Sequence, residues 1–124
     1  MQLKYDVHTI HGDLIIVLKE KGVIINNAQE FLDVIIHIPS DRIILNKENI
    51  HEDFFNLRSG LAGEILQKAV NYSRRVGIVG DFSIYESKSL KDFIYESNKS
   101  NKIVFVSTVE EGLKRLSIKS SITF

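Results

Sequence analysis

Residues 54–81 of this chain are FFNLRSGLAGEILQKAVNYSRRVGIVGD, and this stretch decides the predicted fold. Apolar side chains recur at helical spacing through residues 60–72, which predicts a helix. Its inward stripe is expected to consist of Leu61, Ile65, Leu66, Ala69 and Val70. Residues 76–79, VGIV, then form an apolar run typical of a strand buried on both faces. A helix that leads into such a strand indicates an α/β domain with a mainly parallel sheet.

Toward the N-terminus, the alternation of strand and helix continues. Residues 43–45, IIL, predict a short buried strand. A helix is expected before it, because Asn27 and Glu30 form a capping-box pattern and Pro39 stops the helix. The predicted inward stripe of this helix is Ala28, Phe31, Leu32, Ile35 and Ile36.

The chain is predicted to open with a β-hairpin. Residues 3–9 alternate in polarity, as a strand with one buried face does. The turn at residues 11–13, HGD, leads into the apolar run of residues 14–18.

Toward the C-terminus, two more helices and one strand are expected. Ser89 and Asp92 form a capping-box pattern for a helix, and Asn98 is its predicted C-cap. Residues 103–106, IVFV, predict the last strand, and Thr108 is the predicted cap of the final helix. The predicted order of elements is ββαβαβαβα, with right-handed crossovers between the parallel strands.

The 124 residues suit one domain, which we expect over residues 1–117, followed by a C-terminal tail at residues 118–124. Sixteen Lys and Arg residues balance sixteen Asp and Glu residues, which argues against a dedicated nucleic-acid binder and against a polybasic membrane-surface protein. The longest aliphatic run, residues 14–18, is too short to span a membrane, and residues 1–6 lack the apolar stretch of a signal peptide. The chain contains no Cys, which fits a reducing compartment, so we expect a cytoplasmic protein.

Several short patterns carry a resemblance to a known family. They are the Phe-Phe pair, the Leu-Arg-x-Gly-Leu-Ala-Gly-Glu run, the Gln-Lys and Asn-Tyr pairs and the Val-Gly-Asp strand end within residues 54–81, and the Glu-Ser-Asn helix end at residues 96–98. In these patterns the chain resembles a bacterial family of uncharacterised proteins, the domain of unknown function family 4180. The resemblance covers nearly the whole chain and is densest over residues 53–107. It implies no activity, because none is assigned to the family.

A second resemblance, at the level of the fold, is to the STAS domains of anti-sigma factor antagonists, which share the opening hairpin and the alternating helices and parallel strands. It implies a regulatory domain that works through protein contacts. In STAS domains a regulatory serine can sit at the start of the helix after the third strand, and Ser59 lies near that place. The chain has Arg58-Ser59-Gly60 where the STAS run is Asp-Ser-Ser-Gly, and this departure weakens the case for a phosphorylated serine.

Arg58, Ser59 and Gly60 form the first part of the candidate site. A Ser before a helix caps it by accepting a backbone N–H, and this is the simplest interpretation, with Arg58 paired to a nearby carboxylate. The same helix start can instead hold an anion, with Arg58 as a bidentate clamp, or be tuned by phosphorylation. Gly60 and Gly63 are expected to allow a close backbone approach on an adjacent helix face.

Four further charged residues extend the candidate site. Glu64 and Lys68 lie one helical turn apart on a polar stripe, which is either a solvated face or the lining of a cleft. Asp81 follows a predicted strand, and ligands of open α/β sheets bind beyond the carboxyl ends of strands. Glu96 opposes the dipole at its helix end, so we expect it to have a partner such as Arg58.

No metal and no cofactor are expected. His8 and His11 flank the predicted hairpin turn, but no third ligand is spaced to join them, and zinc needs three or four convergent ligands. The GxGxxG and Walker patterns of nucleotide-binding loops are absent from the sequence.

Two functions remain open at this point. The first is a small STAS-like regulatory domain that binds a protein partner without turnover and is tuned by an anion or a phosphate near Ser59. The second is a small-molecule binder or weak enzyme that holds Arg58, Glu64, Asp81 and Glu96 in one polar pocket. We favour the first, because no catalytic motif is recognised. We also expect a homodimer, since helices that all lay on one face of the sheet would leave the other face to be covered.

Overall fold

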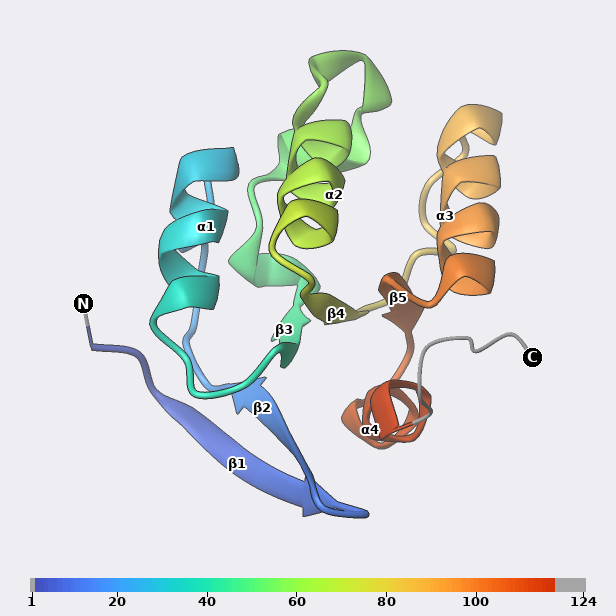
Figure 1. The fold of residues 1–124 in the computed structure, drawn as a ribbon. Helices are drawn as coiled ribbons and strands as arrows, with labels where there is room; N and C mark the ends of the chain where they lie inside the picture. Colours follow the sequence, from blue (N-terminus) through green and yellow to red (C-terminus); the bar gives the residue numbers. More distant parts are fainter. Residues whose placement is uncertain (1, 118–124) are drawn as a thin grey trace.

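A mixed five-stranded sheet forms the centre of the structure, with the strand order β1-β2-β3-β4-β5 (Figure 1). The strands of this computed structural model are β1 (Tyr5–Ile10), β2 (Asp13–Leu18), β3 (Arg42–Asn46), β4 (Arg75–Val79) and β5 (Ile103–Val106). β1 and β2 form the predicted antiparallel hairpin, and β2 to β5 run parallel. The structure describes residues 2–117, so the predicted tail at residues 118–124 lies outside the described part.

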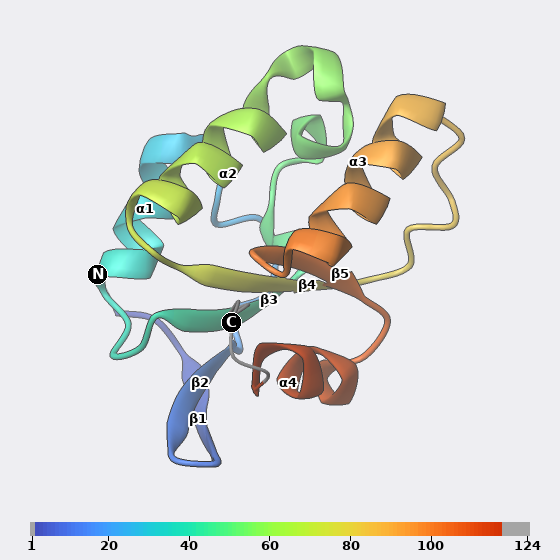
Figure 2. The ribbon, with the colours of Figure 1, turned by 45° about the vertical axis from the view of Figure 1, so that its right-hand side comes forward.

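Helices lie on both faces of the sheet. They are α1 (Ala28–Ile36), α2 (Leu61–Asn71), α3 (Lys88–Ser100) and α4 (Val109–Ser117). Figures 1 and 2 show α1, α2 and α3 together on one face, and α4 on the opposite face. β3 is connected to α2 by three short 3-10 turns, η1 (Lys47–Asn49), η2 (Glu52–Phe55) and η3 (Leu57–Ser59). The predicted α/β class and the order ββαβαβαβα are therefore confirmed.

The larger hydrophobic core lies between the sheet and the helices α1 to α3. One row of paired residues crosses four strands on this face: Ile16, Ile43, Val76 and Ile103. Each of these side chains is at most 1% exposed. Because successive side chains of a strand point to opposite faces, the next row of residues must face α4.

A smaller core lies between that next row and α4. The row consists of Val17, Ile44, Gly77 and Val104. A Cβ atom at position 77 would lie 3.6 Å from Cδ1 of Leu116 in α4, and one at position 112 of the helix would lie 3.0 Å from Cδ1 of Ile44. Glycines on both the sheet and the helix thus let α4 lie close to the strands.

The predicted homodimer loses its original reason in this fold. The crossovers step in sequence order and place α1, α2 and α3 on one face, as that prediction assumed. The chain then crosses to the other face, where α4 buries the apolar row. Self-association therefore stays a prediction that the fold does not require.

Capping patterns in the sequence locate the starts of α1 and α4, where Asn27 and Thr108 accept a backbone N–H as predicted, and miss the start of α3. Asn27 caps α1, and its side chain accepts the N–H of Glu30 as predicted. The predicted cap of α3 at Ser89 is wrong, because Ser87 accepts the N–H of Leu90 and the helix begins between them. Several serines lie close together in this loop, and the path of the chain selects which of them caps.

The inward stripes of α1 and α2 differ from the prediction near their C-terminal ends. Ile36 and Val70 were expected to face the core, but their side chains are 51% and 44% exposed. In α1 the buried stripe contains Val34 instead, which continues the helical spacing from Phe31. Ile36 is the last residue of α1, where no further turn of the helix covers it.

Candidate functional site

A cavity of about 490 Å³ opens between the loop that precedes α2 and the N-terminus of α3. Its lining consists of Asn56, Leu57, Arg58, Ser87 and Ser89. The helices α2 and α3 both begin on this side of the molecule, beyond the carboxyl ends of the strands (Figure 1). This is the edge at which open α/β sheets bind ligands.

Gly60 and a hydrogen bond to Ser59 form the start of α2. The Ser59 hydroxyl donates to the carbonyl of Asp53 at 2.6 Å and accepts the N–H of Leu61 at 3.1 Å. Gly60 occupies the N-cap position with φ +83°, a left-handed conformation that favours glycine. Ser59 lies one position before the N-cap and accepts the first N–H of the helix, so the expected serine cap is replaced by Gly60, and Ser59 is an exposed residue.

The expected close approach at the two glycines of this segment is wrong. A Cβ atom at Gly60 or at Gly63 would meet no heavy atom within 4 Å. Gly60 is explained by its backbone conformation, and Gly63 lies on the exposed side of α2.

Arg58 brings an available positive charge to the cavity. Its side chain is exposed, and within the described part of the chain it forms no ion pair, contrary to the carboxylate partner expected from the sequence. The first turn of α3 contains no acidic residue, so the positive end of that helix is not compensated by its own side chains. The cavity lining itself contains no carboxylate.

The other predicted site residues are not brought to this cavity. Glu64 is exposed on α2, and Lys68 is half-buried on the same helix. Glu96 lies 3.8 Å from Lys99 of its own helix, so the expected pairing with Arg58 is wrong. Helical neighbours three residues apart face each other, which makes the local partner the easier one to reach.

Asp81 lies beyond the carboxyl end of β4, as predicted, and its carboxylate is engaged locally. Its Oδ1 accepts the Ser83 hydroxyl at 2.6 Å and the Ser83 N–H at 3.0 Å. These two hydrogen bonds lower the pKa of Asp81, with a further contribution from the nearby Lys47 ammonium. The arrangement is an ordinary turn at a strand end.

Sequence reasoning missed a second polar cluster at the same edge, centred on Lys47. Its ammonium lies 4.0 Å from a carboxylate oxygen of Glu52 and 5.1 Å from the ring centroid of Tyr85. The Tyr85 hydroxyl donates to the other oxygen of Glu52 at 3.0 Å, and its ring stacks on Phe55. Lys47 directly follows β3, so a search for polar residues just after each predicted strand would have found it.

The cluster around Lys47 is internally compensated. The Tyr85 hydroxyl is the largest cause that raises the pKa of Lys47, and burial opposes it. Burial is the largest cause that raises the pKa of the Tyr85 hydroxyl. A cation with a carboxylate and two aromatic faces around it has its contacts already supplied by the protein. This cluster therefore holds the connection after β3 against the loop after β4.

Over residues 2–117, no three His, Asp or Glu side chains gather where they could hold a metal ion. None of the helices in that range has the length and apolar character that crossing a membrane requires.

Comparison with known proteins places the chain in a family. A family model described as a domain of unknown function, DUF4180, matches residues 10–116. The chain belongs to this family. The resemblance that the sequence patterns carried is thereby confirmed, and the match extends from the end of β1 to Leu116 in α4. Membership of DUF4180 assigns no activity.

This DUF4180 chain was also compared with curated proteins and with solved structures. No protein with a curated description matches it. Among solved structures, one that is similar is the crystal structure of a candidate anti-sigma factor antagonist from Thermotoga maritima. The two chains share 13% identity and a TM-score of 0.48, over 92% of the DUF4180 chain and 95% of the other. The STAS resemblance expected from the sequence points to the same group of proteins, and a likeness of this extent carries no argument about function.

Proposed function

We propose that this DUF4180 chain is a small regulatory binding domain that works through protein contacts and is tuned by a phosphate group held beside Arg58. The observation that carries the proposal is the cavity of about 490 Å³ between residues 56–58 and the N-terminus of α3. It combines an arginine without a described ion pair, two serine hydroxyls and the start of a helix.

Phosphate suits these groups chemically. An arginine guanidinium binds a phosphate through two parallel hydrogen bonds, and serine hydroxyls donate to its oxygens. Backbone N–H groups at a helix start, together with the positive end of the helix dipole, favour an anion in the same place. Ser87 already caps α3, so Ser89 and the free N–H groups of the first turn supply the remaining donors.

Two exposed apolar side chains, one in the loop before α3 and one on α3, support a protein partner. Ile84 lies in the loop that leads to Ser87, and its side chain is 61% exposed. Tyr95 on α3 is 63% exposed, although Lys99 lies over its ring. Exposed apolar groups on the segment that also supplies one wall of the cavity fit a contact surface on which a bound phosphate changes the affinity.

The proposal does not include catalysis. A single polar pocket built from Arg58, Glu64 and Asp81 would have supported a small-molecule binder or weak enzyme. No hydrogen bond or ion pair joins any two of these three side chains in the described part of the chain, and the cavity beside Arg58 is lined by neither carboxylate. Binding therefore needs fewer assumptions than turnover.

Phosphorylation of Ser59 would be a covalent form of the same regulation. The hydroxyl is exposed, and a phosphate there would remove the hydrogen bond that it donates to Asp53. The positive start of α2 and Arg58 would lie beside the new charge. Mass spectrometry of protein purified from its own cell would detect an added mass of about 80 Da at Ser59, and also any self-association.

A titration with phosphate, monitored through the amide signals in NMR spectra, tests the proposed function. Inorganic phosphate, added at constant ionic strength, should shift the amide signals of Arg58, Ser87 and Ser89 saturably. Arg58→Ala should weaken this binding about tenfold, because a charge-assisted pair is lost. Lys21→Ala removes an exposed charge elsewhere and should leave the affinity unchanged. Equal affinity in the wild type and Arg58→Ala would reject the site.

A further inference from the structure

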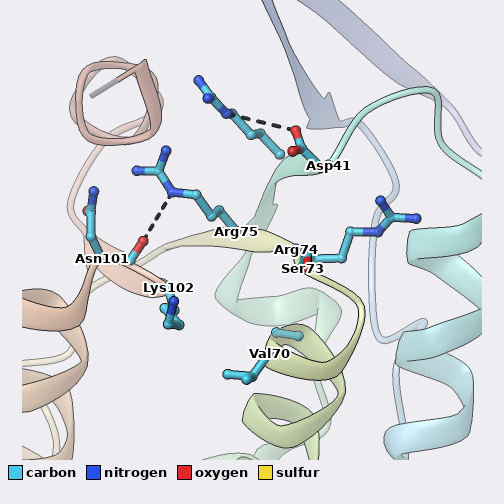
Figure 3. Close-up of a pocket in the computed structure, with 9 residues that line it drawn as sticks. Asp41, Val70, Ser73, Arg74, Arg75, Asn101 and Lys102 are labelled. Atoms are coloured by element: carbon cyan, nitrogen blue, oxygen red, sulfur yellow. Dashed lines mark hydrogen bonds and ion pairs between the residues drawn. The ribbon is translucent and has the colours of Figure 1, made fainter. Parts of the chain in front are cut away.

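A second cavity, of about 290 Å³, lies at the opposite ends of the strands from the first, beside the amino ends of β3, β4 and β5 (Figure 3). Four of its lining residues are cationic, Arg42, Arg74, Arg75 and Lys102, against a single carboxylate, Asp41. The chain as a whole has no net charge, so this cavity concentrates positive charge locally.

Arg75 is the central residue of this cavity. It is only 8% exposed, yet no carboxylate in the described part of the chain lies within ion-pairing distance of it. Its guanidinium donates to three backbone carbonyls, those of Asn101 at 3.2 Å, Arg115 at 3.1 Å and Leu116 at 3.3 Å. The carbonyls satisfy its hydrogen bonds but carry only partial negative charge.

The nearby carboxylates are directed to a different arginine. Asp13 lies 3.1 Å from a guanidinium nitrogen of Arg42, and Asp41 lies 3.9 Å from its Nε. Burial is the largest cause that lowers the pKa of Arg75, and repulsion from Arg42 is the next. Asp41 and Asp13 act on Arg75 only beyond ion-pairing distance and raise its pKa, whereas Arg42 and Arg115 lower it.

A buried cation without a counter-ion is unfavourable, because it has lost its hydration and gained no opposite charge. The C-terminal ends of α3 and α4 point to this edge, and their carbonyls account for part of the positive cluster. These carbonyls accept the three hydrogen bonds that Arg75 donates. They do not account for Lys102, whose exposed side chain lines the same cavity from the start of β5.

We infer that this cavity binds a small oxyanion of the phosphate class at the amino ends of β4 and β5, where Arg75 and Lys102 line it. Its volume lies at the lower limit of ligand pockets, which restricts the ligand to a small one. Figure 3 shows Arg75 and Lys102 on the side of the cavity toward Asn101, whereas Arg74 points away from Arg75. Arg74 is therefore not included among the ligand contacts.

This inference is independent of the site beside Arg58, because the two cavities lie at opposite ends of the strands and share no lining residue. One experiment reads both. Inorganic phosphate is titrated at constant ionic strength into the wild type, Lys102→Ala, Arg58→Ala and Lys21→Ala, and the amide signals of Ser73, Arg75 and Lys102 are followed together with those of Arg58, Ser87 and Ser89. Lys102 and Lys21 are both exposed, so neither substitution threatens the fold.

The amide signals at the second cavity should shift saturably in the wild type. Lys102→Ala should weaken the binding about tenfold, while Arg58→Ala and Lys21→Ala leave it unchanged. If those signals show no saturable shift, or if Lys102→Ala binds phosphate as tightly as the wild type, the inference is wrong. A loss of the shifts around Arg58 alone would reject the proposed function and leave this inference standing.

Discussion

The side-chain amide of Asn98 in α3 forms a two-point contact with the backbone of Phe105 in β5. Its Oδ1 accepts the N–H of Phe105 at 2.7 Å, and its Nδ2 donates to the carbonyl of the same residue at 3.4 Å. β5 is an edge strand of the sheet, so these backbone groups have no neighbouring strand. The amide thus takes the place of a strand partner and shields part of an open edge. The prediction that Asn98 is a C-cap is wrong, since α3 continues to Ser100 and Asn101 caps it.

Replacement of Asn98 by Ala should destabilise the protein. The N–H of Phe105 would lose its partner beside a buried ring, which costs about 1–3 kcal/mol in the free energy of unfolding. Asn71→Ala is the matched control, because that amide is exposed and contacts only Gln67 of its own helix. Urea denaturation should place the control within about 0.5 kcal/mol of the wild type. Equal stability of the two variants would show that the contact contributes nothing.

The same substitution at two glycines should have opposite effects. A Cβ atom at Gly80 would lie 2.7 Å from Cβ and 2.9 Å from Cδ of Lys47, so Gly80→Ala must displace that side chain. We expect a loss of about 1–3 kcal/mol in the free energy of unfolding. Gly63 lies inside α2 with open space around it, so Gly63→Ala should stabilise by up to about 1 kcal/mol. Thermal unfolding measures both, and a stabilised Gly80→Ala protein would contradict the close contact with Lys47.

Removal of the Tyr85 hydroxyl should lower the pKa of Lys47. Tyr85→Phe keeps the ring that stacks on Phe55 but removes the hydroxyl that is the largest cause of the raised pKa. An NMR titration of the lysine side chain follows this pKa directly. Tyr95→Phe is the control, because Tyr95 is exposed on α3 and contacts Lys99 instead. An unchanged titration of Lys47 in Tyr85→Phe would mean that the aromatic faces and Glu52 set its pKa.

The free energy of unfolding should decrease as the pH is lowered through the acidic range, partly because of Glu30. Its Oε1 accepts the backbone N–H of Asn26 at 2.8 Å and the side-chain amide of Asn26 at 3.0 Å, and both bonds lower the pKa of Glu30. A carboxylate whose pKa is lower in the folded state stabilises the fold above its unfolded pKa, which for Glu is about 4.3. This stabilisation is lost as the pH falls from there through the lower pKa of the folded state.

Two variants separate the contributions to this pH dependence. Glu30→Gln should remove the contribution entirely and flatten the acidic side of the stability curve. Asn26→Ala should keep the larger, backbone part and lose only the side-chain part. Urea denaturation across the acidic range compares the slopes, and identical slopes in Glu30→Gln and the wild type would contradict the lowered pKa.

Local capping signals were right at Asn27 and wrong at Ser89. The cap at Asn27 needs only residues of the same turn, and the sequence shows them. Asn98 was misassigned because its partner, Phe105, belongs to the following strand and becomes a neighbour only when α3 packs on the sheet edge. Ser59 was expected to cap α2, but Gly60 occupies the N-cap position, and the bond of Ser59 to Asp53 depends on the fold of the preceding 3-10 turns. The cavity beside Arg58 requires the start of α3 as its second wall, which no pattern around Arg58 reveals.

The sequence by itself determined the order of strands and helices and the faces that most of them bury, because hydrophobic period and capping are set by residues within a few positions of one another. Only the tertiary structure decided that α4 crosses to the second face. That placement depends on close contacts between the sheet and the helix, of Gly77 with Leu116 and of Gly112 with Ile44. The tertiary structure also decided where charge is left without compensation. Nothing in the sequence distinguishes the charge of Arg58 from that of Arg75. The packing around each arginine determines which anions can reach it.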